Sequence, residues 1–130
     1  MPKKDRRRGL LFLAEFSVLN GGRERMGNRM RMTIISASEA DFYIRQGKYT
    51  LIDLRDSAAY REGHLKGAWN VPYEEFLRME EKLDRNQKYL FYCDRGGSSL
   101  DVCKRLSRRG YHVVSMLGGM AAYRGRYLVK

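Results

Sequence analysis

The order of apolar and polar positions from residue 31 onward predicts strands that alternate with helices. Short runs rich in β-branched and aromatic residues are typical of buried strands. Such runs occupy residues 33–35, 50–54, 68–71, 89–92 and 112–116. Between and after them, helical spacing of apolar residues or helix start and stop signals mark residues 36–46, 58–62, 73–83, 100–109 and 120–127. The alternation predicts an α/β fold with a mainly parallel sheet.

Local signals mark the ends of several of these elements. Ser36 and Glu39 have the spacing of a capping box, which predicts a helix start, and Gly47 is placed to end that helix. Pro72 ends the strand that precedes it, because proline has no N–H to donate to a sheet. Gly118 and Gly119 predict a turn before the last helical segment.

The aromatic run at residues 89–92 leads into a cysteine, Cys93, and a short loop before the next helical segment. This order places the thiol at the N-terminus of a helix, where unpaired N–H groups and the helix dipole favour anions. We therefore expect a lowered pKa for the Cys93 thiol and a nucleophilic thiolate near neutral pH. Cys103 shares a helix face with Leu100 and Leu106, so we expect it to be a core residue.

The loop after Cys93 has the composition of an anion cradle. Its residues are Asp94, Arg95, Gly96, Gly97, Ser98 and Ser99. Both glycines can adopt positive φ, which lets successive N–H groups converge on an anion. We expect Ser98 or Ser99 to cap the following helix and to donate a hydroxyl to a bound sulfur, and Arg95 to attract an anionic substrate.

Arg55 follows the strand at residues 50–54, as Cys93 follows its own strand. Ligands of parallel α/β sheets lie outside the carboxyl ends of the strands, so both residues are expected at one crevice. We interpret Asp53 and Arg55 as a structural pair that ties the strand-end loops beside this crevice. We expect His64 to be a hydrogen-bonded scaffold residue.

Charge and cysteine content bear on the cellular location of the protein and on its N-terminal residues. The 130 residues carry a net charge of +11, and only two of them are cysteines, which predicts a reducing, cytoplasmic location without disulfides. Residues 1–31 form a basic extension before a domain at 32–130; translation from Met26, Met30 or Met32 is an alternative hypothesis. The apolar segment 10–19 contains Glu15 and is too short for a bilayer, so we expect neither export nor membrane contact.

Four separated motifs together resemble a rhodanese domain, over roughly residues 33–127. They are Leu51–Arg55, Tyr60–Pro72, Cys93–Ser99 and Gly118–Tyr123. The resemblance is greatest to single-domain thiosulfate sulfurtransferases. It implies a three-layer α/β/α sandwich with a five-stranded parallel sheet, and sulfur transfer through a persulfide of Cys93.

The resemblance also implies the participants in the reaction. Cys93 is the catalytic nucleophile; Arg55, Asp94, Arg95, Gly96, Gly97, Ser98 and Ser99 bind the substrate. The donor is thiosulfate or another small anionic sulfur compound, and the acceptor is cyanide, a small thiol or a thioredoxin-like protein. We expect a monomer without cofactors, since His64, His112 and the cysteines lack metal-ligand spacing and no nucleotide loop occurs.

Two alternatives stay open. A Cys-loop phosphatase or arsenate reductase is disfavoured, because it needs arginine six positions after the cysteine, where Ser99 stands. A non-enzymatic persulfide carrier or interaction module is compatible with Cys93. Nucleic-acid binding by the basic extension is not expected, because no basic platform interleaved with aromatic residues is evident.

Overall fold

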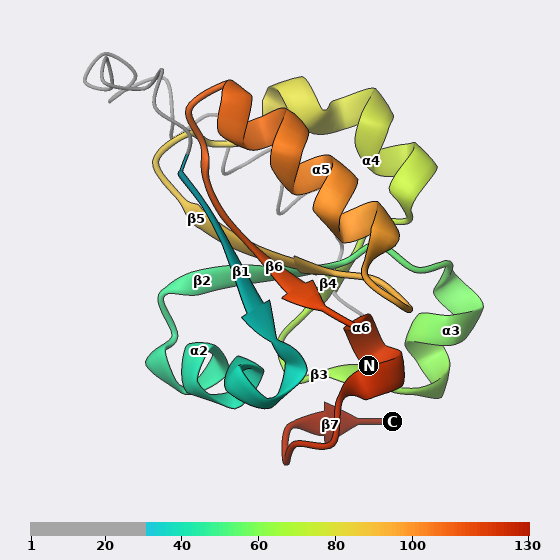
Figure 1. Ribbon diagram of the computed structural model, residues 1–130. Coiled ribbons are helices and arrows are strands. Elements are labelled where there is room, and N and C mark those ends of the chain that lie inside the picture. The colour runs from blue at the N-terminus through green and yellow to red at the C-terminus, as the bar shows by residue number, and fades with distance from the viewer. Residues whose placement is uncertain (1–30) are drawn as a thin grey trace.

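The computed structural model describes residues 31–130, which form a sheet with helices on both faces (Figure 1). The central strands are β1 (Arg31–Ser36), β2 (Tyr49–Asp53), β4 (Trp69–Asn70), β5 (Lys88–Tyr92) and β6 (His112–Leu117). They are ordered β1-β6-β5-β2-β4, and every adjacent pair is parallel. The predicted five-stranded parallel sheet is therefore confirmed.

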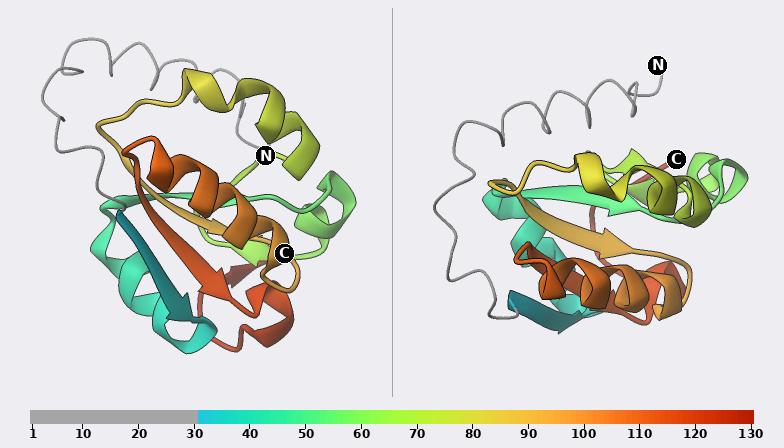
Figure 2. Two further views of the ribbon diagram at one scale, coloured as in Figure 1. Left: turned by 45° about the horizontal axis from the view of Figure 1, so that its top comes forward. Right: turned by 90° about the horizontal axis from the view of Figure 1, so that it is seen from above.

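Helices cover the two faces of this sheet. They are η3 (Ala37–Glu39), α2 (Ala40–Gln46), α3 (Ser57–Glu62), α4 (Tyr73–Met79), η4 (Glu80–Lys82), α5 (Gly97–Arg108) and α6 (Gly119–Ala122). Two views show α4 and α5 on one face, with α2 on the other (Figure 2). No helix within residues 31–130 has the length and apolarity needed to cross a bilayer.

Strand β5 explains why the sheet needs helices on both sides. Its alternate residues enter two separate cores: Tyr89 and Phe91 pack with α4 and α5 residues, while Leu90 and Tyr92 pack on the opposite face. All four are completely buried. A central parallel strand buried on both faces reads as a continuous apolar run, as this one does.

Helix α2 has the predicted start and end signals, the Ser36–Glu39 capping box and Gly47. The Ser36 N–H donates to Glu39 Oε1 at 2.8 Å, and the capping box precedes η3 and α2. Gly47 ends α2 with a φ of 67°, in the left-handed region that favours glycine. The predicted extension at residues 1–31 lies outside the described residues except for Arg31, which instead is the first residue of β1 and pairs with His112.

The predicted helix over residues 120–127 is wrong beyond its first turn. Helix α6 ends at Ala122, and the chain continues to β7 (Leu128–Val129), which pairs antiparallel with β3 (His64–Leu65). The Tyr123 hydroxyl donates to Asp41 Oδ1 at 2.6 Å and accepts the Tyr127 N–H at 2.9 Å. These tertiary hydrogen bonds hold the segment in an extended path that local helical spacing does not reveal.

His112, at the start of β6, is expected to make the stability of the protein depend on pH. Arg31 and Lys88 both pair with His112 on neighbouring strands. Burial, followed by the charges of Lys88 and Arg31, lowers the pKa of His112. The unfolded chain therefore binds this proton more readily, so the free energy of unfolding should fall as the pH drops below about 6.5 and level off below the folded-state pKa.

Urea unfolding of the wild type and His112→Gln at about pH 7.5 and about pH 5.5 checks this expectation. The variant should lose less stability between the two pH values than the wild type does. Equal losses in both proteins would assign the pH dependence to other groups.

Candidate active site

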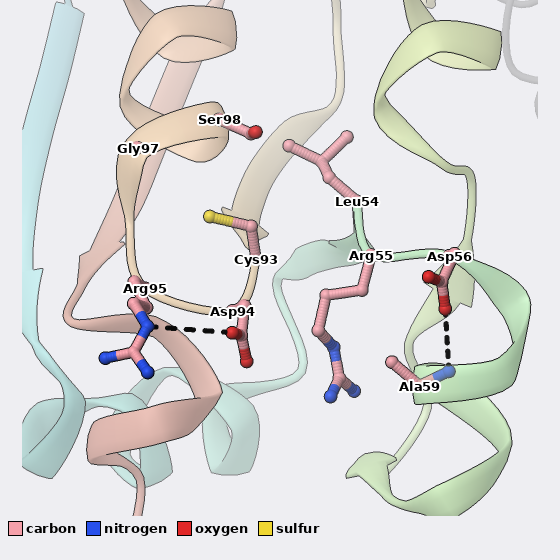
Figure 3. A pocket seen from close by; sticks show the side chains of 9 residues that line it. All are labelled: Leu54, Arg55, Asp56, Ala59, Cys93, Asp94, Arg95, Gly97 and Ser98. Atoms are coloured by element: carbon pink, nitrogen blue, oxygen red, sulfur yellow. Dashed lines mark hydrogen bonds and ion pairs between the residues drawn. The ribbon is translucent and has the colours of Figure 1, made fainter.

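An open pocket of about 510 Å³ lies at the carboxyl ends of β2 and β5 (Figure 3). Its lining comes from two chain segments: Leu54, Arg55, Asp56 and Ala59, and Cys93, Asp94, Arg95, Gly97 and Ser98. The expectation that Arg55 and Cys93 share one crevice is confirmed. The parallel pairing of β2 with β5 brings these two loops together.

The loop after β5 brings a backbone N–H group to the Cys93 sulfur. The Gly96 N–H donates to Cys93 Sγ at 3.1 Å, and Gly96 has a φ of 107°. The sulfur points toward the start of α5, near Gly97 and Ser98 (Figure 3). Cys93 is only 6% exposed although it lines the pocket. The sulfur thus accepts a hydrogen bond from an N–H group at the positive end of a 12-residue helix. Such a site is suited to a thiolate or a persulfide.

Helix α6 fixes the same loop from the other side. The Met120 N–H donates to the Cys93 carbonyl and the Ala121 N–H to the Asp94 carbonyl, both at 2.9 Å. Gly119 has a φ of 59°, and a Cβ there would lie 2.5 Å from the Asp94 oxygen. Sequence reasoning assigned only a turn to Gly119 and missed this support for the nucleophile loop. The separated Gly118–Tyr123 motif was the available signal.

The structure changes the expected roles of the loop glycines and serines. Helix α5 starts at Gly97 with Gly96 at its N-cap and without a side-chain cap, so the predicted serine cap is wrong. Of the two loop glycines, only Gly96 has positive φ, and Gly97 is helical. Ser98 lines the pocket. Ser99 is buried behind the loop, where its hydroxyl lies 3.2 Å from the Gly96 carbonyl and 3.1 Å from Ser115 Oγ.

Arg55 is held by the protein itself. Its Nε and Nη2 atoms donate to Asp53 at 3.0 and 2.8 Å, and Nη2 also donates to the Gly63 carbonyl at 2.6 Å. The Asp53 side chain is fully buried and that of Arg55 is 11% exposed. Burial alone would lower the pKa of Arg55, but the hydrogen bond and charge of Asp53 raise it on balance. The predicted structural pair is therefore present at the pocket.

Asp94 and Arg95 form the exposed part of the loop. Arg95 Nε lies 3.9 Å from Asp94 Oδ2, with the two side chains 82% and 68% exposed. Such a long, solvated ion pair contributes little to stability. Both side chains nevertheless line the pocket and set the charge at its opening.

The remaining candidates are structural. Cys103 is fully buried on α5, its thiol lies 3.6 Å from the Val114 carbonyl, and burial raises its pKa, which confirms the predicted core role. His64 Nδ1 lies 2.8 Å from the Tyr60 carbonyl, and the two rings stack at 3.7 Å, as expected of a scaffold residue. Across residues 31–130 no three metal-ligating side chains come together.

The described domain matches a known protein-family model. The model of the Rhodanese-like domain matches residues 36–126. A putative sulfurtransferase, YtwF of Bacillus subtilis, is 35% identical over 75 residues, which are 58% of this chain and 73% of that protein. The thiosulfate sulfurtransferase GlpE of Coxiella burnetii is 29% identical over 94 residues, or 72% of this chain and 88% of GlpE.

A longer relative and a solved structure add to these matches. A tRNA sulfurtransferase of Pyrobaculum aerophilum is 39% identical over 66 residues, 51% of this chain, but the chain spans only 14% of that protein. A crystal structure of a rhodanese-related protein from Thermoplasma volcanium superposes with a TM-score of 0.66 at 28% identity, covering 75% of this chain and 97% of that one.

Proposed function

This chain belongs to the rhodanese-like sulfurtransferase family, and on that premise we propose that it carries a sulfane sulfur as a persulfide on Cys93. The Cys93 thiolate attacks the outer sulfur of thiosulfate. A bond forms between Sγ and that sulfur, the S–S bond of thiosulfate breaks, and its electron pair leaves with sulfite. An acceptor such as cyanide, a small thiol or a thioredoxin-like protein then removes the outer sulfur and regenerates the thiolate.

The observation that carries this proposal is the position of Cys93 Sγ. The sulfur lines an open pocket, accepts the Gly96 N–H at 3.1 Å and lies at the start of α5. Each hydrogen bond to a charged sulfur acceptor contributes about 1.5–3 kcal/mol. Ser98 lines the same pocket and has a hydroxyl to offer to the outer sulfur.

Thiosulfate is proposed as the donor because the relative GlpE is named a thiosulfate sulfurtransferase. A reducing, cytoplasmic setting is proposed because both cysteines of the chain, Cys93 and Cys103, are free thiols. The small acceptors follow from chemistry, since any soft nucleophile that enters the pocket can attack a persulfide.

Intact-mass spectrometry after incubation with thiosulfate tests the proposal. The protein should gain the mass of one sulfur atom, lose it on addition of cyanide or a thiol, and gain nothing as Cys93→Ser. Cys103→Ala is the matched control and should gain the sulfur as the wild type does. A persulfide that forms but resists cyanide and small thiols would favour a carrier for a protein acceptor; no gain with any sulfur donor would overturn the proposal.

A further inference from the structure

We propose that Asp94 determines which donors load Cys93, by penalising dianions such as thiosulfate relative to donors that carry one negative charge. Thiosulfonates are a class of such monoanionic sulfane-sulfur donors. The inference rests on the proposed persulfide chemistry and deepens it, because it names the residue that makes loading depend on the charge of the donor.

Positive and negative side chains are closely balanced around the pocket. The lining contains two guanidinium groups, Arg55 and Arg95, and two carboxylates, Asp56 and Asp94. The carboxylate of Asp53 lies directly behind Arg55, at 2.8 Å from its Nη2 atom. Three carboxylates thus accompany two guanidiniums, so the charged side chains offer a dianion no surplus of positive charge.

The charge of Arg55 is already compensated by Asp53. Three hydrogen bonds to Asp53 and one to the Gly63 carbonyl engage its Nε and Nη2 atoms, and Asp94 also acts on it electrostatically. A donor would have to compete with a buried ion pair for this guanidinium. Arg95 is the more exposed cation, but Asp94 lies 3.9 Å from it and offsets its charge.

Asp94 has a fixed backbone beside the nucleophile. It follows Cys93 directly, and its carbonyl accepts the Ala121 N–H at 2.9 Å while the neighbouring Cys93 carbonyl accepts that of Met120. Figure 3 shows the Asp94 side chain between those of Arg95 and Arg55 along the pocket, beyond the Cys93 sulfur. A donor that enters the pocket to reach Sγ therefore meets a lining that includes the Asp94 carboxylate, on a residue whose backbone is held by α6.

Both donor classes react by the same balanced step. With methanethiosulfonate, Cys93 Sγ bonds to the outer sulfur, the S–S bond of the donor breaks, and the electron pair leaves with methanesulfinate. With thiosulfate the leaving group is sulfite. The two donors thus form the same persulfide and differ by one unit of charge, which isolates the electrostatic contribution of Asp94.

The expected magnitude follows from Coulomb's law. For charges roughly 7 Å apart in water, Coulomb's law predicts that a carboxylate slows the approach of a dianion roughly tenfold at low ionic strength. A monoanion feels half that energy, which corresponds to roughly threefold. Salt at about 1 M reduces the screening length to about 3 Å and should remove most of the difference.

The test measures the second-order rate constant of persulfide formation with each donor. Asp94→Asn should raise this constant roughly tenfold for thiosulfate and roughly threefold for methanethiosulfonate at low salt, and both gains should shrink in about 1 M salt. Asp94→Glu keeps the charge and should leave the ratio of the two donors unchanged. Glu81→Gln removes an exposed carboxylate of η4, outside the pocket lining, and is the matched control.

Equal gains with both donors, no gain with thiosulfate, or gains that persist at high salt would overturn the role of Asp94. A change in the donor ratio in Asp94→Glu would also do so, because it would indicate altered loop geometry in place of altered charge. If the wild type forms no persulfide with either donor, the proposed function itself fails, and this outcome is distinct from the others.

Discussion

Gly119→Ala is expected to destabilise the protein by about 2–5 kcal/mol and to disturb the environment of Cys93. Part of the loss comes from the backbone: Gly119 has a φ of 59°, and a left-handed conformation costs an L-residue with a side chain about 1–2 kcal/mol. The rest comes from overlap, which costs about 1–3 kcal/mol in a packed site. The new Cβ would lie 2.5 Å from the Asp94 carbonyl oxygen, and backbone cannot rotate away as a side chain does.

The same overlap connects stability to chemistry. The Cys93 and Asp94 carbonyls accept the N–H groups of Met120 and Ala121, so relief of the clash must move the nucleophile loop away from α6. A displacement of about 1 Å at a reacting group can reduce a rate by about 100-fold. Chemical denaturation measures the first effect; the rates of Cys93 alkylation and of persulfide formation measure the second.

Gly67→Ala separates overlap from conformational strain. Gly67 has a φ of 84°, but a Cβ there would meet no atom within 4 Å. This control should lose only about 1–2 kcal/mol and keep the reactivity of Cys93. A Gly119→Ala protein no less stable than Gly67→Ala, with wild-type alkylation of Cys93, would show that α6 does not fix the loop.

Strong local periodicity made most of the fold predictable. The aromatic run of β5 and the capping box before α2 each depend on neighbouring residues only, and both are where the sequence predicts them. The segment after Ala122 was mispredicted because its path depends on Asp41, about 80 positions away, which accepts the Tyr123 hydroxyl. Helical spacing carries no information about such a distant partner.

The site shows the same division between local and tertiary information. That Cys93 and Arg55 share one pocket follows from parallel topology and was predictable. The inward rotation of Ser99 was not, because it depends on the Ser115 hydroxyl of β6 beneath it. The hydrogen bond from Arg55 to the Gly63 carbonyl was equally unpredictable from the sequence, because it depends on the position of β3 relative to β2.

Arg55→Met is expected to destabilise the protein by about 3–5 kcal/mol, because it leaves the fully buried Asp53 carboxylate without its counter-charge. The double variant Asp53→Asn, Arg55→Met should recover much of this loss, since a neutral pair needs no compensation in a buried site. Urea unfolding of the wild type, both single variants and the double variant gives the double-mutant cycle that measures this coupling. Arg61→Met, an exposed arginine on the neighbouring α3, is the matched control and should change stability by less than about 0.5 kcal/mol.

The cycle also decides between two roles for Arg55 at the pocket. If Arg55 mainly binds an anionic donor, Arg55→Met should be about as stable as Arg61→Met but should form the persulfide more slowly. The double variant would then recover no stability. A guanidinium engaged by Asp53 and the Gly63 carbonyl gives the opposite pattern, a large loss that Asp53→Asn offsets. The 11% exposure and four donated side-chain hydrogen bonds of Arg55 favour the second pattern, in which it acts on the reaction only by positioning the β2–α3 loop.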